Sequence, residues 1–230
     1  MLLKKKVRLP QKRKQKTPKN VLESKVVKIG ILSLQGDIEE HVSMMKKALD
    51  RTGMPGEVSW VKTPEEVSSV DALVIPGGES TTIGKLLRLY GIDNEIRKLA
   101  EKGVPIMGTC AGLVLLSNSG CEEVEKTGQP LLGLIDASVE RNAFGRQKES
   151  FEADIGIPVL GKEKYHAVFI RAPAITKTGK DVNILAGYNG KIVAAEKNNI
   201  ILLAFHPELS GDTRMHEYFL SHLKKSTTPP

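Results

Sequence analysis

The chain has 230 residues, of which 40% are hydrophobic, and its formal net charge at pH 7 is +7. This length predicts one globular domain with a sizeable core and argues against two. Two cysteines are too few for a disulfide framework. The chain has neither the run of about 20 apolar residues that spans a bilayer nor a secretory signal, so the sequence predicts a cytoplasmic protein without membrane contact.

The positive charge is concentrated at the start of the chain. Nine of the 34 Lys and Arg residues lie in residues 1–20, which hold no acidic residue, so the other 25 face 27 acidic residues. Such a segment cannot bury enough apolar surface to fold, and we expect residues 1–25 to be a basic, disordered leader. It can bind nucleic acid electrostatically, have no role, or be foreign to the natural protein; the sequence leaves these alternatives open.

Uninterrupted apolar runs followed by helical patterns recur in the first half. VVKIGILSL (26–34) predicts a buried strand, and residues 38–53 predict an amphipathic helix after a short turn. Residues 70–75 and 104–107 predict two more strands, each again followed by a helical segment. This alternation predicts an α/β fold with a doubly wound, mostly parallel sheet that helices cover on both faces.

Shorter strand-like pieces follow, separated by Gly, Pro and Asn. They lie near residues 151–155, 166–170, 182–186 and 191–195. We expect them to add mixed or antiparallel strands to the same sheet. Residues 200–205 (IILLAF) predict one more buried strand, MHEYFLSHLKK predicts a closing helix, and residues 225–230 are expected to be a frayed tail.

A G-x-C-x-G pattern, Gly108 to Gly112, lies between a predicted strand and a predicted helix. It is the thiol counterpart of the serine nucleophile elbow, in which a strained turn presents the nucleophile and glycines avoid collisions. Cys110 then lies at a helix N-terminus, which favours the thiolate, and the amide of Ala111 can stabilise an oxyanion. The alternative is an ordinary buried cysteine, which is how we interpret Cys121.

The H-P-E triplet follows the predicted strand 200–205 directly. Catalytic groups of open α/β sheets gather at the carboxyl ends of strands, so His206 can reach Cys110 as a general base while Glu208 holds the imidazole. A lone His at a strand end is otherwise a satisfied hydrogen-bonding residue. The remaining histidines are His41, His166, His216 and His222. They fall on predicted helices or a strand without an obvious partner, and we expect them to be non-catalytic.

A third motif, PGGESTT (76–82), joins a predicted strand to a helix and offers amides at a helix N-terminus. It is not a phosphate-binding Walker loop, because Gly84 and Lys85 are followed by Leu86 instead of Ser or Thr. The loop is better suited to an oxyanion-hole amide and to contacts with a bound amino acid.

Together these three motifs resemble the class I glutamine amidotransferases. The resemblance narrows to the branch formed by the glutaminase subunits of pyridoxal 5′-phosphate synthase, and it covers residues 26–224. The strings that carry it are SLQGD (33–37), PGGESTT (76–82), GTCAGL (108–113), ERNAFGRQ (140–147), SFEAD (150–154), FIRAP (169–173) and AFHPEL (204–209). The resemblance implies one amidotransferase domain over 26–224, to which the leader is an addition.

The resemblance also implies roles for individual residues. The triad is Cys110, His206 and Glu208, and the oxyanion is held by the backbone of Gly78 and Ala111. The residues that hold glutamine are Gly78, Glu79, Ser80, Arg141, Ile170 and Arg171. An Arg can hold the substrate carboxylate bidentately, although salt bridges that tie loops to the sheet are the alternative for both arginines. No metal and no organic cofactor is expected.

Similar proteins work in a complex with a synthase subunit, which activates them on docking and receives the ammonia internally. The implied function is therefore hydrolysis of L-glutamine to glutamate and ammonia for a pyridoxal 5′-phosphate synthase (lyase) subunit in a hetero-oligomer. By the same analogy, Gln35, Gly36, Asp37, Glu40 and His41 lie near that interface and influence the oxyanion hole. Two alternatives stay open, a cysteine hydrolase or glutaminase of another pathway and a catalytically idle protein that binds nucleic acid through residues 1–25.

Overall fold

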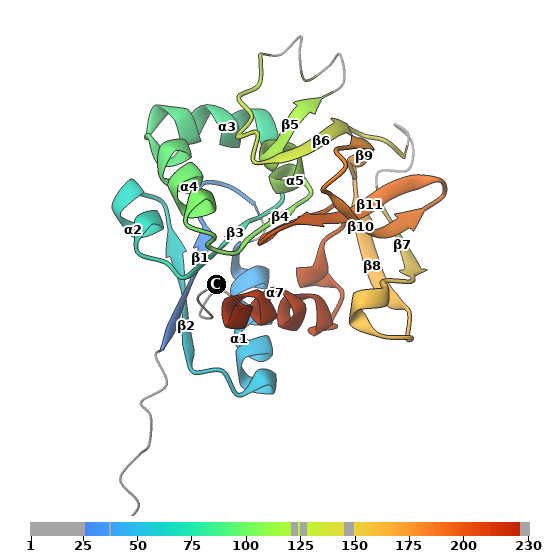
Figure 1. Cartoon of the computed structure of the whole chain (residues 1–230), viewed down its shortest axis with the longest axis horizontal. Helices are drawn as coiled ribbons and strands as arrows, with labels where there is room; N and C mark the ends of the chain where they lie inside the picture. Colours follow the sequence, from blue (N-terminus) through green and yellow to red (C-terminus); the bar gives the residue numbers. More distant parts are fainter. Residues whose placement is uncertain (1–25, 37, 121–123, 125–127, 145–149, 226–230) are drawn as a thin grey trace, which may run out of the picture.

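The computed structural model describes residues 26–36, 38–120, 124, 128–144 and 150–225 (Figure 1). The predicted leader, Cys121 and residues 226–230 of the predicted tail lie outside this part of the chain. Within it, ten strands form one sheet, in the order β2-β1-β3-β4-β12-β11-β9-β6-β5 with β10 beside β11. β7 and β8 form a separate two-stranded sheet.

The elements have the following bounds. The strands are β1 (Val27–Leu32), β2 (Gly56–Val61), β3 (Ala72–Ile75), β4 (Ile106–Thr109), β5 (Ser117–Gly120), β6 (Ile135–Glu140), β7 (Ser150–Ile155), β8 (Tyr165–Ile170), β9 (Ala174–Thr178), β10 (Asn183–Tyr188), β11 (Lys191–Lys197) and β12 (Ile200–Leu203). The α-helices are α1 (Ile38–Thr52), α2 (Pro64–Ser68), α3 (Ser80–Leu89), α4 (Ile92–Glu101), α5 (Ala111–Leu116) and α7 (Arg214–Lys225). Two short 3-10 helices are η1 (Pro158–Leu160) and η2 (Pro207–Leu209).

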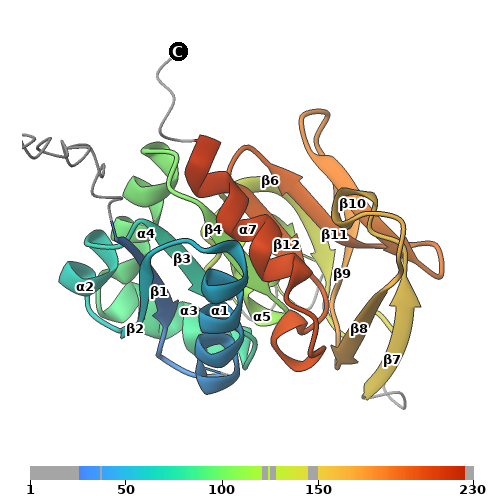
Figure 2. The same ribbon diagram turned by 90° about the horizontal axis from the view of Figure 1, so that it is seen from below.

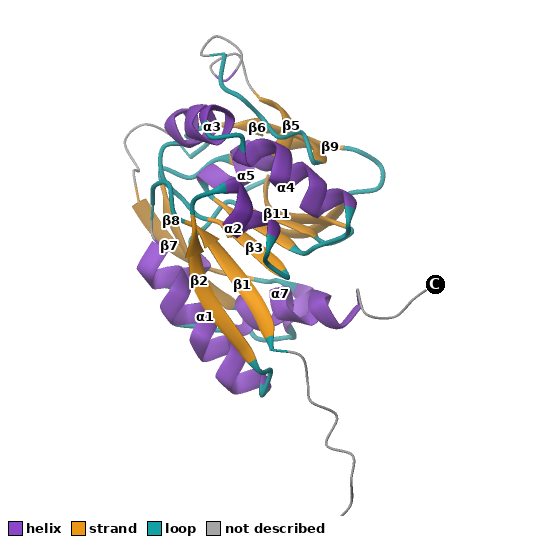
Figure 3. Cartoon of the chain, turned by 90° about the vertical axis from the view of Figure 1, so that its left-hand side faces the viewer, coloured by secondary structure: helices purple, strands orange, loops and turns teal. Residues whose placement is uncertain are grey.

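The first half builds the parallel part of the sheet. β2, β1, β3, β4 and β12 are mutually parallel neighbours, and every residue of β3, β4 and β12 is buried. Such strands need cover on both faces. α1 and α7 lie side by side against one face, and α2 to α5 cover the other (Figures 2 and 3). The predicted α/β fold with a mostly parallel, doubly wound sheet is confirmed.

The second half adds antiparallel strands, as predicted, but not all to the same sheet. β9, β10 and β12 pair antiparallel with β11, and β9 pairs antiparallel with β6. The predicted pieces 151–155 and 166–170 instead become β7 and β8, which pair only with each other among the described strands. Residues of β8 alternate between buried and more exposed positions, and those of β7 alternate between exposed and half-buried positions up to the buried Ile155, which is typical of a strand pair with one face on a core. The expectation of a single sheet was therefore wrong for this pair.

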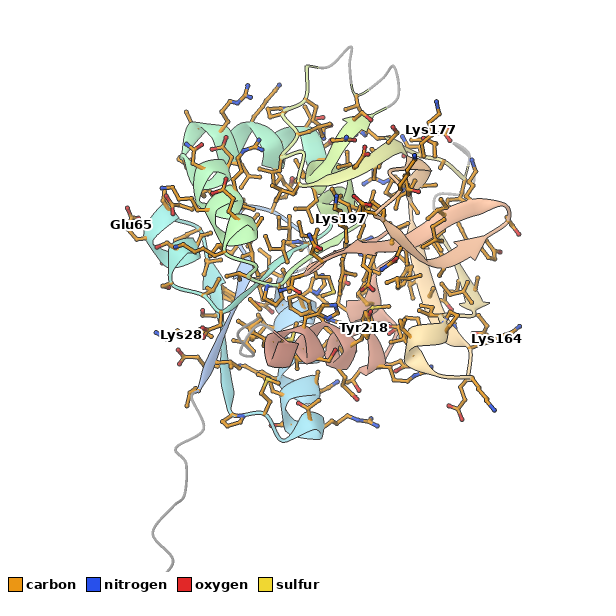
Figure 4. All side chains as sticks on the ribbon, in the orientation of Figure 1. Lys28, Glu65, Lys164, Lys177, Lys197 and Tyr218 are labelled. Carbon is orange, nitrogen blue, oxygen red and sulfur yellow. The ribbon has the colours of Figure 1, made fainter. Side chains whose placement is uncertain are left out.

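Charged side chains lie at the periphery of this framework. Lys28, Glu65 and Lys164 project outward from the ribbon (Figure 4), and all three are exposed.

No helix in the described part of the chain has the length and apolar content needed to cross a bilayer.

An aromatic cluster fastens the β7–β8 pair to the rest of the molecule. Phe169 is fully buried on β8. Its ring stacks on Phe151 of β7 with centroids 4.6 Å apart, and it also contacts Tyr188 of β10, Phe144 and Phe205. These rings join β8 to β10 and to the end of β12, which places the residues that follow β8 beside those that follow β12.

We expect Phe169→Ala to lower the free energy of unfolding by about 3–5 kcal/mol, because it leaves a large cavity between the two sheets. Urea unfolding followed by circular dichroism measures the change. Val159→Ala is the control, because Val159 is 44% exposed and its truncation should change stability by less than about 0.5 kcal/mol. Equal losses in both variants would contradict the role of the cluster.

Candidate active site

Cys110 lies at the apex of a strained turn between β4 and α5. Its backbone has φ 49° and ψ −100°, a region that L residues occupy only where surrounding structure enforces it. Its N–H donates to the carbonyl of Leu203 on β12, at 2.8 Å. The predicted strained elbow is confirmed, and Cys110 is the free cysteine of the described residues.

The two glycines around Cys110 are required because neither position has room for a side chain. A Cβ at Gly108 would lie 2.6 Å from the backbone of Gly112, and a Cβ at Gly112 would lie 2.1 Å from the carbonyl oxygen of Ile75 on β3. Both separations are impossible without backbone movement. The predicted collisions with strand and helix are therefore confirmed.

His206 and Glu208 follow the neighbouring strand. β12 and β4 are parallel with Leu203 opposite Thr109, so the residues after both strands emerge at the same edge of the sheet. The His206 ring contacts the Glu208 carboxylate, with Nδ1 2.7 Å from Oε1, and both side chains are buried. The backbone N–H of His206 donates to Val168 of β8 at 2.8 Å, which fixes its position against the β7–β8 pair.

A cavity of about 310 Å³ opens at this edge of the sheet. Its walls are Gly78, Glu79, Ser80, Cys110, Ala111, Val114, Arg141, Asn142, Ile170, Arg171, Pro173 and His206. All of the predicted glutamine and oxyanion residues thus line one cavity together with Cys110 and His206, while Glu208 lies behind His206. The thiol of Cys110 lies 3.8 Å from the carbonyl of Ile170, to which it donates. A pocket of this size with several convergent polar groups can hold a small amino acid.

Glu79 and Arg141 form an ion pair in the wall of the cavity. Arg141 Nη2 lies 3.0 Å from Glu79 Oε1, and Glu79 also caps α3 by accepting the N–H of Thr81. The salt-bridge alternative for Arg141 is thus realised between two cavity residues. Arg171 is exposed, has φ 43°, and makes no ion pair with the described residues.

Three further contacts hold the PGG loop; two come from the segment before α1, which the resemblance singled out, and one comes from Gln129. Gln35 Oε1 accepts the N–H of Glu79 at 3.2 Å, and a Cβ at Gly36 would lie 1.9 Å from the carbonyl of Gly77. The segment before α1 therefore packs on the loop that carries Gly78, while the predicted place of Gln35 and Gly36 near a partner interface stays a prediction. Ser80 donates to Gln129 Oε1 at 3.1 Å, and nothing in the sequence indicated Gln129.

The expectation that the other histidines lack partners was wrong for three of them. His166 contacts Glu152 and Asp154, which raise its pKa, and His222 contacts the carbonyl of Tyr218. His41 is fully buried, with Nε2 3.1 Å from Glu208 Oε2. A signal for His41 exists in the sequence, because it falls on the apolar face of its helix, in register with the buried Met44, Met45, Ala48 and Leu49.

His216, on α7, is buried without a hydrogen-bond partner among the described residues. Its ring lies 5.8 Å from that of His41. Burial lowers the pKa of His216 to about 3, so this imidazole is neutral in the folded protein.

The fold and the site place a cysteine on a strand–helix elbow beside a His-carboxylate pair, an arrangement that is typical of α/β enzymes with a nucleophilic cysteine. Comparison with known proteins makes the assignment specific. The sequence profile of the SNO glutamine amidotransferase family matches residues 31–225. The chain belongs to this family, and the predicted glutamine amidotransferase is confirmed.

Relatives and solved structures agree with this assignment. The "Pyridoxal 5'-phosphate synthase subunit PdxT" of Archaeoglobus fulgidus is 56% identical over 84% of this chain and 97% of its own length. The protein of the same description from Methanococcoides burtonii is 52% identical over 86% and 99%. A crystal structure described as a glutamine amidotransferase superposes with a TM-score of 0.74 at 44% identity, covering 85% of this chain and 98% of its own.

We expect Gly112→Ala to destabilise the protein by at least about 1–3 kcal/mol, because the added Cβ meets the backbone of β3 and forces it to move. Chemical denaturation measures the change. Gly156→Ala is the matched control, since a Cβ there meets no heavy atom within 4 Å and should change stability by less than about 1 kcal/mol. A Gly112→Ala variant as stable as the control would refute the steric argument.

We expect the free energy of unfolding of His216→Leu to change less with pH in the acid range than that of the wild type. The pKa of His216 is about 3 in the folded protein and 6.5 ordinarily. Between these two values the unfolded chain binds a proton at this residue and the folded protein does not. The contribution of neutral His216 to the free energy of unfolding is fully present above about pH 6.5. It is lost as the pH falls, by about 2 kcal/mol at pH 5. Urea unfolding at pH 7.5 and pH 5 should show that loss in the wild type, with the loss smaller by about that amount in His216→Leu. Identical pH dependence in both proteins would contradict a neutral buried His216.

Proposed function

We propose that this chain is the glutaminase subunit of a pyridoxal 5′-phosphate synthase, and that it hydrolyses L-glutamine to L-glutamate and ammonia through Cys110, His206 and Glu208. One observation carries the proposal: a strained cysteine and the histidine of a His-Glu pair share the wall of one cavity, in a family of glutamine amidotransferases. The names of the relatives supply the pathway. We assign the activity to a domain spanning residues 26–224, in the cytoplasm.

The reaction begins with attack of the Cys110 thiolate on the side-chain amide carbon of glutamine. The backbone N–H groups of Gly78 and Ala111 stabilise the tetrahedral oxyanion. Protonated His206 gives its Nε2 proton to the amide nitrogen, the C–N bond breaks, and ammonia leaves a γ-glutamyl thioester on Cys110.

Hydrolysis of the thioester returns the enzyme to its starting state. Neutral His206 removes a proton from water, the resulting hydroxide adds to the thioester carbon, and the thiolate leaves as glutamate forms. Glu208 stays ionised throughout. It accepts Nδ1–H of His206, which holds the imidazole in the tautomer with a free Nε2 and stabilises the imidazolium.

The walls of the cavity carry one negative and one positive side chain, which match the ammonium and the carboxylate of an amino acid. Glu79 suits the α-ammonium and Arg141 the α-carboxylate, and their 3.0 Å contact keeps the two groups side by side before substrate enters. Ser80, Ile170 and Arg171 complete the proposed glutamine contacts. The ammonia is handed to a synthase subunit in a hetero-oligomeric complex, in keeping with the subunit names of the relatives.

We expect Cys110→Ala to lower glutamate release from glutamine by at least about 10³-fold, because the nucleophile is lost. The measurement compares both proteins with and without an added pyridoxal 5′-phosphate synthase subunit from a close relative. Cys121→Ala is the matched control and should keep full, synthase-stimulated activity. Activity that ignores the synthase would point to another partner, and no activity under any condition would leave the binding-protein alternative.

A further inference from the structure

We propose that His41 is a positioning residue for the triad, a neutral imidazole that holds one oxygen of Glu208 so that the other oxygen faces His206. The inference rests on the proposed function of Glu208. It assigns to α1 a contact with the triad carboxylate, whereas the resemblance implied for Glu40 and His41 a place near the partner interface and an influence on the oxyanion hole.

The two carboxylate oxygens of Glu208 each face a different histidine. Oε1 lies 2.7 Å from His206 Nδ1, and Oε2 lies 3.1 Å from His41 Nε2. The side chains of His41 and Glu208 are both completely buried. Oε1 is hydrogen-bonded to His206, whereas the contact of Oε2 with His41 is electrostatic and lacks the alignment of a hydrogen bond. Rotation of the carboxylate would give up both contacts, so its orientation toward His206 depends on His41 as well as on His206.

The surroundings of His41 select one tautomer. Nε2 also lies 3.2 Å from Thr109 Oγ1, at the end of β4, so it faces two oxygen atoms. A lone pair on Nε2 would lie against the charged Oε2, whereas an N–H there is attracted to it. The Nε2–H tautomer is therefore the stable one, and Nδ1 has no hydrogen-bond partner among the described residues.

The same surroundings keep His41 neutral. Burial lowers its pKa well below the ordinary value, and His216 and His206 lower it further. The groups facing it are Glu208, Thr109, His206 and, from α7, His216. Neutrality matters for the triad, because a cation on Oε2 would compete with the imidazolium of His206 for the single negative charge of Glu208.

The position of His41 is set by the core and not by the cavity. His41 does not line the cavity, and its helix is fixed by the buried Met44, Met45, Ala48 and Leu49. A change at residue 41 therefore reaches the substrate through Glu208 or through Thr109, which precedes Cys110, and the Glu208→Gln background separates these two routes. This predicts an effect on kcat and little on KM.

A double-mutant cycle on the synthase-activated enzyme tests the inference. We expect His41→Leu to lower kcat by about 10- to 100-fold, with KM for glutamine within about twofold. His41→Gln, whose amide N–H can replace Nε2–H, should recover most of that loss. In a Glu208→Gln background, His41→Leu should lower kcat by less than about threefold, because the carboxylate it acts on is gone. An equal loss in both backgrounds would overturn the proposal.

His216→Leu is the control for general damage to the core. It replaces an equally buried neighbour of His41 that has no hydrogen-bond partner in the described chain, and it should leave kcat within about twofold. A loss of kcat as large as that of His41→Leu would show that the packing between α1 and α7 matters instead of the contact with Glu208.

A measurement without substrate separates this inference from the proposed function. Two-dimensional ¹H–¹⁵N spectra of histidine side chains in the wild-type protein report tautomer and charge directly. We expect His41 to be the neutral Nε2–H form at pH 7 and to remain neutral at pH 6. A cationic His41, or the Nδ1–H tautomer, would overturn the inference even in a protein with full glutaminase activity.

Discussion

The parallel pairing of β4 with β12 is the constraint on which the active site depends. Because Leu203 lies opposite Thr109, the residues after both strands emerge at one edge, and the N–H of Cys110 continues the ladder to Leu203. A shift of this register by one residue would exchange the faces of the strand and break the alignment of Cys110 with His206. Every residue of both strands is buried, so packing on both faces of the sheet supports the backbone ladder in this register.

Close packing at this edge leaves no room for ordinary side chains. Gly112 lies against the carbonyl of Ile75 on β3, and Gly36 lies against that of Gly77. The strained turn of Cys110 is therefore held against β3 and β12, and the PGG loop lines the same cavity as Cys110. Such a backbone conformation costs roughly 1–3 kcal/mol, and the buried sheet supplies the rigidity that maintains it.

The sequence predicts what depends on local patterns and misses what depends on tertiary neighbours. Continuous apolar runs predicted β1, β3, β4 and β12, because a parallel strand covered on both faces has a simple pattern. The edge strand β2 was missed, since GEVSWV is only partly buried and offers no such run. The G-x-C-x-G and H-P-E motifs likewise indicated the elbow and its partners, whereas the contact of His41 with Glu208 joins residues 167 positions apart in sequence and has no local signature.

Burying the carboxylate of Glu208 is unfavourable unless polar groups surround it. A Lys or Arg beside it would offset that cost most strongly, but it would also neutralise the charge that the imidazolium of His206 requires in the proposed mechanism. Neutral donors compensate the carboxylate by their dipoles and leave its net charge available. The helix that carries His41 is packed by its apolar face against the core, so the donor is held in place by the interactions that fold the domain. The position of the Glu208 carboxylate is in this way tied to the packing of α1.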